Sequence, residues 1–235
     1  MRKNVLIKLS RSTNPVAKLA FGAMRTPPRW FQLRMLAIRK EGMLVSLIKE
    51  IQQRRGFSMW PDEMANVFHF ANAATKLTGD YAEVGVFRGG SAKLICEAKG
   101  ERPLHLFDTF EGLPTTGDHD WSFEESQYSE SQDAVQSYLQ ENSYPNVFFY
   151  KGLFPETAKP VENKKFSFVH LDVDLLSSTL DALTFFYPRM ERGGIILSHD
   201  FSTTFGVRKA FYDYYADKPE PVFELGTSQC FTVKA

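Results

Sequence analysis

An acid followed by closely spaced glycines is the part of the sequence best suited to bind a small ligand. Glu83 is followed by Gly85, Gly89, Gly90 and Ser91. Glycine lets the backbone turn sharply and lets a ligand approach closely, and the free N–H groups at the start of a helix attract a carboxylate or a phosphate. Dinucleotide sites use the spacing GxGxxG. This segment lacks that spacing, which disfavours a dinucleotide.

A second acid, Asp108, ends the next apolar segment, 25 residues after Glu83. A carboxylate at the end of such a strand can accept hydrogen bonds from both ribose hydroxyls of an adenosine. The pattern E/D-x-G-x-x-x-G resembles the first motif of class I methyltransferases, whose glycines pass the methionine part of S-adenosylmethionine. The two features together predict this cofactor. The alternative is that Gly85 and Gly89 only form a tight turn.

A third segment, Lys151-Gly152-Leu153-Phe154, follows a predicted strand. In such folds the end of this strand lies beside the adenine, where the ring of Phe154 could stack. The alternative is that Phe154 belongs to the core. Both interpretations stay open on the sequence alone.

Three further acids, Asp172, Asp174 and Asp200, follow two later apolar segments, and His199 precedes the last of them. The carboxyl ends of parallel strands face the crevice in which such sheets bind ligands. Methyl transfer is an in-line displacement that needs an acceptor oxygen held in place and relieved of its proton. A sugar hydroxyl is a very weak acid, so a base or a metal ion is needed. Asp174, or less readily Asp172, could instead cap the following helix.

The elements that must position these residues alternate between strands and helices, which predicts a doubly wound, mostly parallel α/β sheet. Pro61 suits the start of a helix, with Asp62 and Glu63 in the first turn, where the helix dipole favours anions. His105 and His170 lie inside apolar strands and are expected in the core. Strands are predicted at 81–86, 104–107, 147–151, 166–171 and 194–198, helices at 61–77, 91–99, 131–142, 178–187 and 206–215, and a C-terminal hairpin at 222–225 and 229–233.

Four segments in order resemble the successive motifs of the macrocin O-methyltransferase family. They are Glu83 to Ser91, Phe107 to Pro114, Lys151 to Thr157 and Leu171 to Thr179. The resemblance runs from about residue 61 to 215 and implies a Rossmann-like class I methyltransferase fold with seven strands. It also implies an enzyme that methylates a hydroxyl of a sugar or of a glycosylated small molecule. The expected cofactor contacts are Glu83, Gly85, Phe87, Gly89, Gly90, Ser91, Asp108, Thr109, Gly152 and Phe154.

The resemblance further implies that Asp172 binds a divalent ion and helps to deprotonate the acceptor. The family places two adjacent aspartates after the fifth strand, whereas this sequence has His199 and Asp200. A site made only of oxygen ligands suits Mg²⁺, and an imidazole ligand favours Mn²⁺, Fe²⁺ or Zn²⁺. The expected ligands are Asp172, His199 and Asp200. Two alternatives stay open: a metal-free enzyme with His199 as the base, and a non-catalytic scaffold with this fold.

A long polar loop at residues 109–130 is a candidate lid over the acceptor. Its aromatic residues could pack on a sugar or a ring, and the alternative is a solvated, flexible loop. These residues are Trp121, Phe123 and Tyr128, with His119 between two acids.

Charge is divided unevenly along a chain whose net charge is zero. Residues 1–60 hold 13 Lys and Arg and only two acids, whereas residues 61–235 carry a net charge of −11. We expect a basic helical extension at 1–60, broken near Gly42, and a methyltransferase domain at 61–235. The extension could pack on the domain, form a homo-oligomer interface or contact a membrane surface peripherally. Without a recognisable module, nucleic acid is not an expected partner. Two cysteines and no long apolar run suggest a cytoplasmic protein.

Overall fold

A seven-stranded sheet forms the centre of the protein, as the alternation of strands and helices predicts. The computed structural model describes residues 29–39, 42–56, 58–114 and 126–235. The strand order is β3-β2-β1-β4-β5-β7-β6, with β1 to β5 parallel and β7 antiparallel to both of its neighbours. The strands are β1 (Asp80–Val84), β2 (Leu104–Asp108), β3 (Val147–Lys151), β4 (Phe166–Leu171), β5 (Met190–Ser198), β6 (Phe223–Glu224) and β7 (Cys230–Val233).

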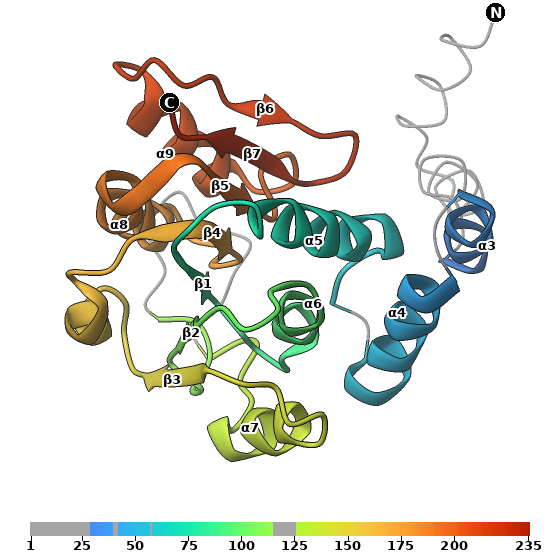
Figure 1. Cartoon of the computed structure of the whole chain (residues 1–235). Helices are drawn as coiled ribbons and strands as arrows, with labels where there is room; N and C mark the ends of the chain where they lie inside the picture. The colour runs from blue at the N-terminus through green and yellow to red at the C-terminus, as the bar shows by residue number, and fades with distance from the viewer. Residues whose placement is uncertain (1–28, 40–41, 57, 115–125) are drawn as a thin grey trace, which may run out of the picture.

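Helices cover both faces of the sheet (Figure 1). Successive side chains of a strand point to opposite faces, so Tyr81 packs beneath α4 to α7 and Ala82 packs toward α8 and α9. The helices are α3 (Arg29–Arg39), α4 (Gly42–Arg55), α5 (Pro61–Ala74), α6 (Gly90–Ala98), α7 (Gln132–Gln140), α8 (Leu176–Phe186) and α9 (Phe205–Tyr215), with short 3₁₀ helices η1 (Glu156–Val161) and η2 (Tyr187–Arg189).

The order of the strands reverses between β1 and β4, which are neighbours although far apart in the sequence. The chain runs outward from β1 through β2 to β3, and from β4 outward through β5. A crevice forms beyond the carboxyl ends of strands at such a reversal. The predicted acids therefore converge from two directions on one end of the sheet.

Most predicted elements differ from the structure by a few residues at one or both ends, and the starts of β5 and α8 differ by two residues or more. β5 begins at Met190 rather than at residue 194, because Met190 pairs with Phe166 across a shift in register. α8 begins at Leu176 rather than at residue 178. Gly42 does begin a new helix, as expected.

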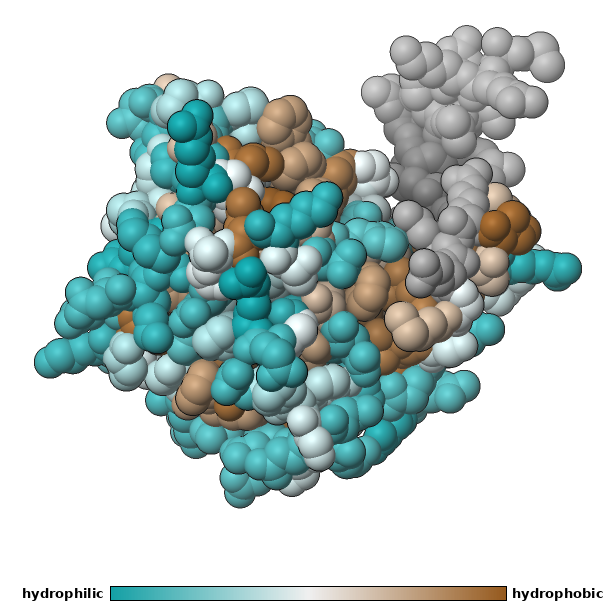
Figure 2. Space-filling view, viewed as in Figure 1, coloured by the Kyte–Doolittle hydropathy of each residue, from teal (hydrophilic) through white to brown (hydrophobic). Residues whose placement is uncertain are grey.

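The helices α3 and α4 lie outside α5 and α6 (Figure 1). Leu44, Ile48 and Ile51 of α4 are buried in the same core cluster as α5 and α6. On α3, by contrast, Trp30 is 64% exposed and Ile38 is 73% exposed. Figure 2 shows apolar side chains emerging in this region and near β6 and β7 on an otherwise largely hydrophilic face. No described helix is both long and apolar enough to cross a bilayer. A membrane or homo-oligomer contact of this region stays a prediction.

Candidate functional site

A cavity of about 380 Å³ lies beyond the carboxyl ends of β1, β2, β4 and β5. It brings together most of the residues that the sequence singles out. Glu83, Gly89, Gly90 and Ser91 do not line it. Its lining includes Gly85, Phe87, Asp108, Thr109, Gly152, Phe154, Asp172, Asp174, His199 and Asp200.

The carboxylate of Asp108 fixes the glycine-rich loop that follows β1. Its Oδ2 accepts hydrogen bonds from the backbone N–H groups of Val86, at 2.6 Å, and Phe87, at 2.9 Å. Its Oδ1 accepts from the N–H of Phe110 at 2.6 Å. These bonds help to hold Phe87 at a φ of 47°, which is uncommon for a residue other than glycine. Asp108 therefore shapes the cavity wall formed by the glycine-rich loop, in addition to lining the cavity itself.

Glu83 lies behind this loop and is completely buried. Its Oε1 pairs with Nδ1 of His170 at 2.8 Å, and His170 is equally buried, as expected for a core histidine. Burial raises the pKa of Glu83, and the hydrogen bond from His170 only partly offsets this effect. Glu83 is thus placed to support the loop from below, and its predicted contact with the cofactor stays a prediction.

Gly85 lies where the glycine-rich loop after β1 contacts the segment that follows β4. Its φ is +85°, and a Cβ at this position would overlap the carbonyl oxygen of Asp172. The N–H of Asp172 also donates to the carbonyl oxygen of Val84 at 2.9 Å. The glycine-rich loop after β1 and the acid after β4 are therefore in direct backbone contact, which only glycine permits.

Phe154 packs against the core, as one interpretation of the sequence predicts, and its stacking on an adenine stays a prediction. Its ring stacks on Phe186, with centroids 5.4 Å apart and planes 11° apart, and meets Phe107 edge to face. The same residue lines the cavity, beside Gly152 and Leu153. Phe154 is part of an aromatic cluster that also forms a wall of the site.

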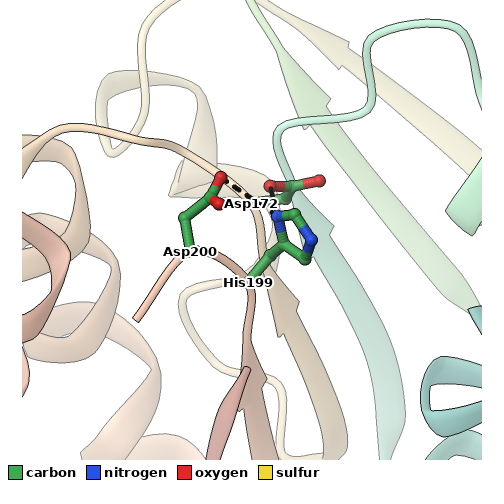
Figure 3. A group of neighbouring side chains, drawn as sticks. All are labelled: Asp172, His199 and Asp200. Atoms are coloured by element: carbon green, nitrogen blue, oxygen red, sulfur yellow. Dashed lines mark ion pairs between the residues drawn. The ribbon is translucent and has the colours of Figure 1, made fainter. Parts of the chain in front are cut away.

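A cluster of one imidazole and two carboxylates also lines the cavity (Figure 3). Nδ1 of His199 lies 3.2 Å from Oδ1 of Asp172 and 3.0 Å from Oδ2 of Asp200. Nδ1 is buried, and neither carboxylate is aligned with it as in a hydrogen bond. One ligand atom from each of the three residues lies within 4.8 Å of the others. Such a convergent set of one nitrogen and two oxygens fits a divalent transition metal.

The charged groups of this cluster strongly influence one another's pKa values. Burial lowers the pKa of His199, but the attraction of Asp172 and the contacts with Asp200 and Glu63 outweigh it, so that the pKa is raised well above its usual value. The nearby carboxylates therefore stabilise positive charge at His199. Burial also raises the pKa of Asp200, but its close contact with His199 and its attraction to that residue outweigh this, so that the pKa is lowered.

Asp174 joins the same group of charges. Burial, followed by repulsion from Asp172 and Asp200, raises its pKa well above the usual value. The sequence leaves two interpretations of Asp174, a residue of the site or a cap of the following helix. Leu175 occupies the N-cap of α8 without a side-chain cap, and Asp174 instead faces the cavity with φ at +59°. Mutual repulsion among buried acids is relieved by a shared proton or by a cation.

Glu63 is a site residue that the sequence alone did not reveal. The sequence predicts only that it lies in the first turn of a helix, where the dipole favours an acid. In the structure Oε2 of Glu63 lies 3.2 Å from Nε2 of His199. The two residues are far apart in the sequence, and only the packing of α5 against the end of β5 brings them together.

The candidate lid is described only at its ends. Tyr128 is 51% exposed, lines the cavity and meets the ring of Phe87 edge to face, with centroids 5.6 Å apart. His119, Trp121 and Phe123 lie outside the described residues. The predicted packing of Tyr128 on an acceptor is compatible with its position and stays a prediction.

The strand order, with β7 antiparallel between β5 and β6, and a cavity beside the glycine-rich end of β1 together define a class I methyltransferase fold. The family described as macrocin O-methyltransferase (TylF) matches residues 61–229. The chain belongs to this family, as its motifs predict.

Individual relatives agree with this assignment. The chain is 29% identical over 156 residues to the Streptomyces olivaceus 8-demethyl-8-(2,3-dimethoxy-alpha-L-rhamnosyl)-tetracenomycin-C 4'-O-methyltransferase. The aligned region covers 60% of this chain and 59% of that protein. The chain thus spans about three fifths of the length of this curated relative. The O-methyltransferase NovP superposes with a TM-score of 0.66 at 23% identity, covering 74% of this chain and 79% of that one. TomG from Streptomyces achromogenes, solved with S-adenosylmethionine, superposes with a TM-score of 0.61 at 12% identity, covering 87% and 96%.

Proposed function

We propose that this protein transfers a methyl group from S-adenosylmethionine to a hydroxyl of a sugar or of a glycosylated small molecule, with the help of a divalent ion. The observation that carries the proposal is the cavity in which the glycine-rich loop after β1 directly adjoins Asp172, His199 and Asp200. The sugar acceptor is supported by a relative that is a rhamnosyl 4'-O-methyltransferase. The methyl donor is supported by a fold neighbour solved with S-adenosylmethionine.

The two sides of the cavity would bind the cofactor and the acceptor, respectively. Gly85, Phe87 and Asp108 line the side that would take the cofactor, and Gly152 and Phe154, which also line the cavity, would flank the adenine. The acceptor would lie toward Asp172. Its O–H bond breaks as the O–CH₃ bond forms, the S–CH₃ bond breaks to leave S-adenosylhomocysteine, and the proton passes to the carboxylate of Asp172.

A divalent ion fits the three-residue cluster better than the metal-free alternative does. Nδ1 of His199 is a buried nitrogen without an aligned hydrogen-bond partner, and it faces two carboxylates. Asp172, His199 and Asp200 would hold the ion, which when bound would lower the pKa of an acceptor hydroxyl. The carboxylates of Asp172 and Asp200, which face Nδ1, would attract a cation. A mixed nitrogen and oxygen set favours Mn²⁺ or another transition metal over Mg²⁺.

Removal of the metal tests this proposal. The purified protein is treated with EDTA, dialysed and assayed with isotope-labelled S-adenosylmethionine and a panel of phenyl glycosides that includes an α-L-rhamnoside. We expect methyl transfer to fall at least ~100-fold after EDTA treatment, because the ion stabilises the charge that develops on the acceptor oxygen. Mn²⁺ should restore the activity at a lower concentration than Mg²⁺. Full activity in EDTA would contradict the metal, and no labelled glycoside would contradict the acceptor class.

A further inference from the structure

The carboxylate of Glu63, at the start of α5, is held by donors on three segments of the chain. Oε2 accepts hydrogen bonds from the N–H of Trp60 at 2.8 Å and from His199 at 3.2 Å. Oε1 accepts from the N–H and the hydroxyl of Ser228, at 3.1 Å and 2.6 Å. Glu63 is only 3% exposed. A buried carboxylate with this many donors has one fixed position.

This fixed carboxylate determines which nitrogen of His199 carries hydrogen. An ionised carboxylate can only accept hydrogen bonds, so Nε2 of His199 must donate its N–H to Glu63. In neutral imidazole the other nitrogen then carries the lone pair. That nitrogen is Nδ1, which faces Asp172 and Asp200. A carboxylate that orients a histidine ligand in this way commonly increases its basicity toward a metal.

We propose that Glu63 is a positioning residue, which holds the N–H of His199 Nε2 so that the Nδ1 lone pair points at a divalent ion between Asp172 and Asp200. This inference rests on the metal site proposed above. It also explains how an imidazole serves at this position, because a histidine needs an acceptor behind it to fix its tautomer and ring orientation. An aspartate at position 199 would need no acceptor behind it, and would instead face the negative charge of Glu63.

The test measures Mn²⁺ binding to the full chain by the loss of the electron paramagnetic resonance signal of free Mn²⁺. Glu63→Gln and Glu63→Ala should weaken Mn²⁺ binding by ~10- to 100-fold, with the larger loss for alanine. The matched control is Asp62→Asn, which removes the neighbouring acid from the same helical turn. Asp62 accepts a hydrogen bond from the N–H of Glu63 through Oδ1, which asparagine retains. Asp62→Asn should leave the dissociation constant unchanged.

A double-mutant cycle with His199→Asp separates positioning from general support of the fold. In that background residue 199 has no N–H to donate, so Glu63→Gln should leave Mn²⁺ binding unchanged or tighten it by removing like charge. Equal weakening in both backgrounds would overturn the positioning role, as would unchanged binding in both Glu63 variants of the native chain. Failure of the native chain to bind Mn²⁺, or binding that survives Asp172→Asn, would instead overturn the metal site itself and the inference with it.

Discussion

Asp172→Asn is expected to lower kcat for methyl transfer by about 10²- to 10⁴-fold, the range that a positioned general base contributes. Asparagine keeps the size of the side chain but cannot accept the acceptor proton and is a weaker ligand for a cation. Asp172 lines the cavity, with Oδ1 3.2 Å from Nδ1 of His199. The affinity for S-adenosylhomocysteine, measured by calorimetry, should change little, because the glycine-rich loop and Asp108 remain intact.

Asp213→Asn is the control for Asp172→Asn. Asp213 is an exposed residue of α9 whose carboxylate pairs only with Lys209 on the preceding turn of the same helix, among the described contacts. Its replacement should leave kcat and cofactor affinity unchanged, because an exposed ion pair contributes little. If Asp172→Asn retained the kcat of the native chain, its role as base would be wrong.

Gly85→Ala is expected to destabilise the protein by about 2–5 kcal/mol and to abolish measurable binding of S-adenosylhomocysteine. Two costs add at this position: a left-handed backbone conformation costs about 1–2 kcal/mol for alanine, and the new methyl group overlaps a backbone oxygen, which costs about 1–3 kcal/mol. The φ of Gly85 is +85° and the overlapped atom is the carbonyl oxygen of Asp172. Urea unfolding measures the first effect and calorimetry the second.

Gly100→Ala separates these two costs. Gly100 has a φ of +61°, but a Cβ there would meet no atom within 4 Å. Its replacement should therefore cost about 1–2 kcal/mol from the backbone alone and leave cofactor binding intact. Gly85→Ala with the same modest loss and normal binding would show that the contact between Gly85 and Asp172 does not organise the site.

The central sheet could be predicted because its signals are local. The predicted bounds of β3 and β4 match the structure in full. Every residue of β4 is buried, as expected for a strand covered on both faces. The glycine-rich turn and the acids at strand ends are likewise adjacent in sequence to the strands that place them. Because β4 and β5 are adjacent parallel strands, Asp172, His199 and Asp200 come together at the same end of the sheet.

The supporting contacts could not be predicted in this way, because they join distant segments. Glu63 meets His199 only after α5 docks beside β5, and no periodic pattern connects the two residues. Asp108 was expected to bind ribose, and its bonds to the N–H groups of Val86 and Phe87 depend on the folded loop. Asp174 resembled a helix cap in sequence, but the backbone turns it toward the cavity at a positive φ.

The most direct test of the central claim is a crystal structure of the protein with Mn²⁺ and S-adenosylhomocysteine, with data collected where manganese scatters anomalously. The account predicts one anomalous peak within coordination distance of Asp172, Asp200 and Nδ1 of His199, with the cofactor product bound beside Gly85 and Asp108. A structure with the product in that cavity but no anomalous peak at the three residues would contradict the metal site. A product bound elsewhere, or not at all, would contradict the proposed function as a whole.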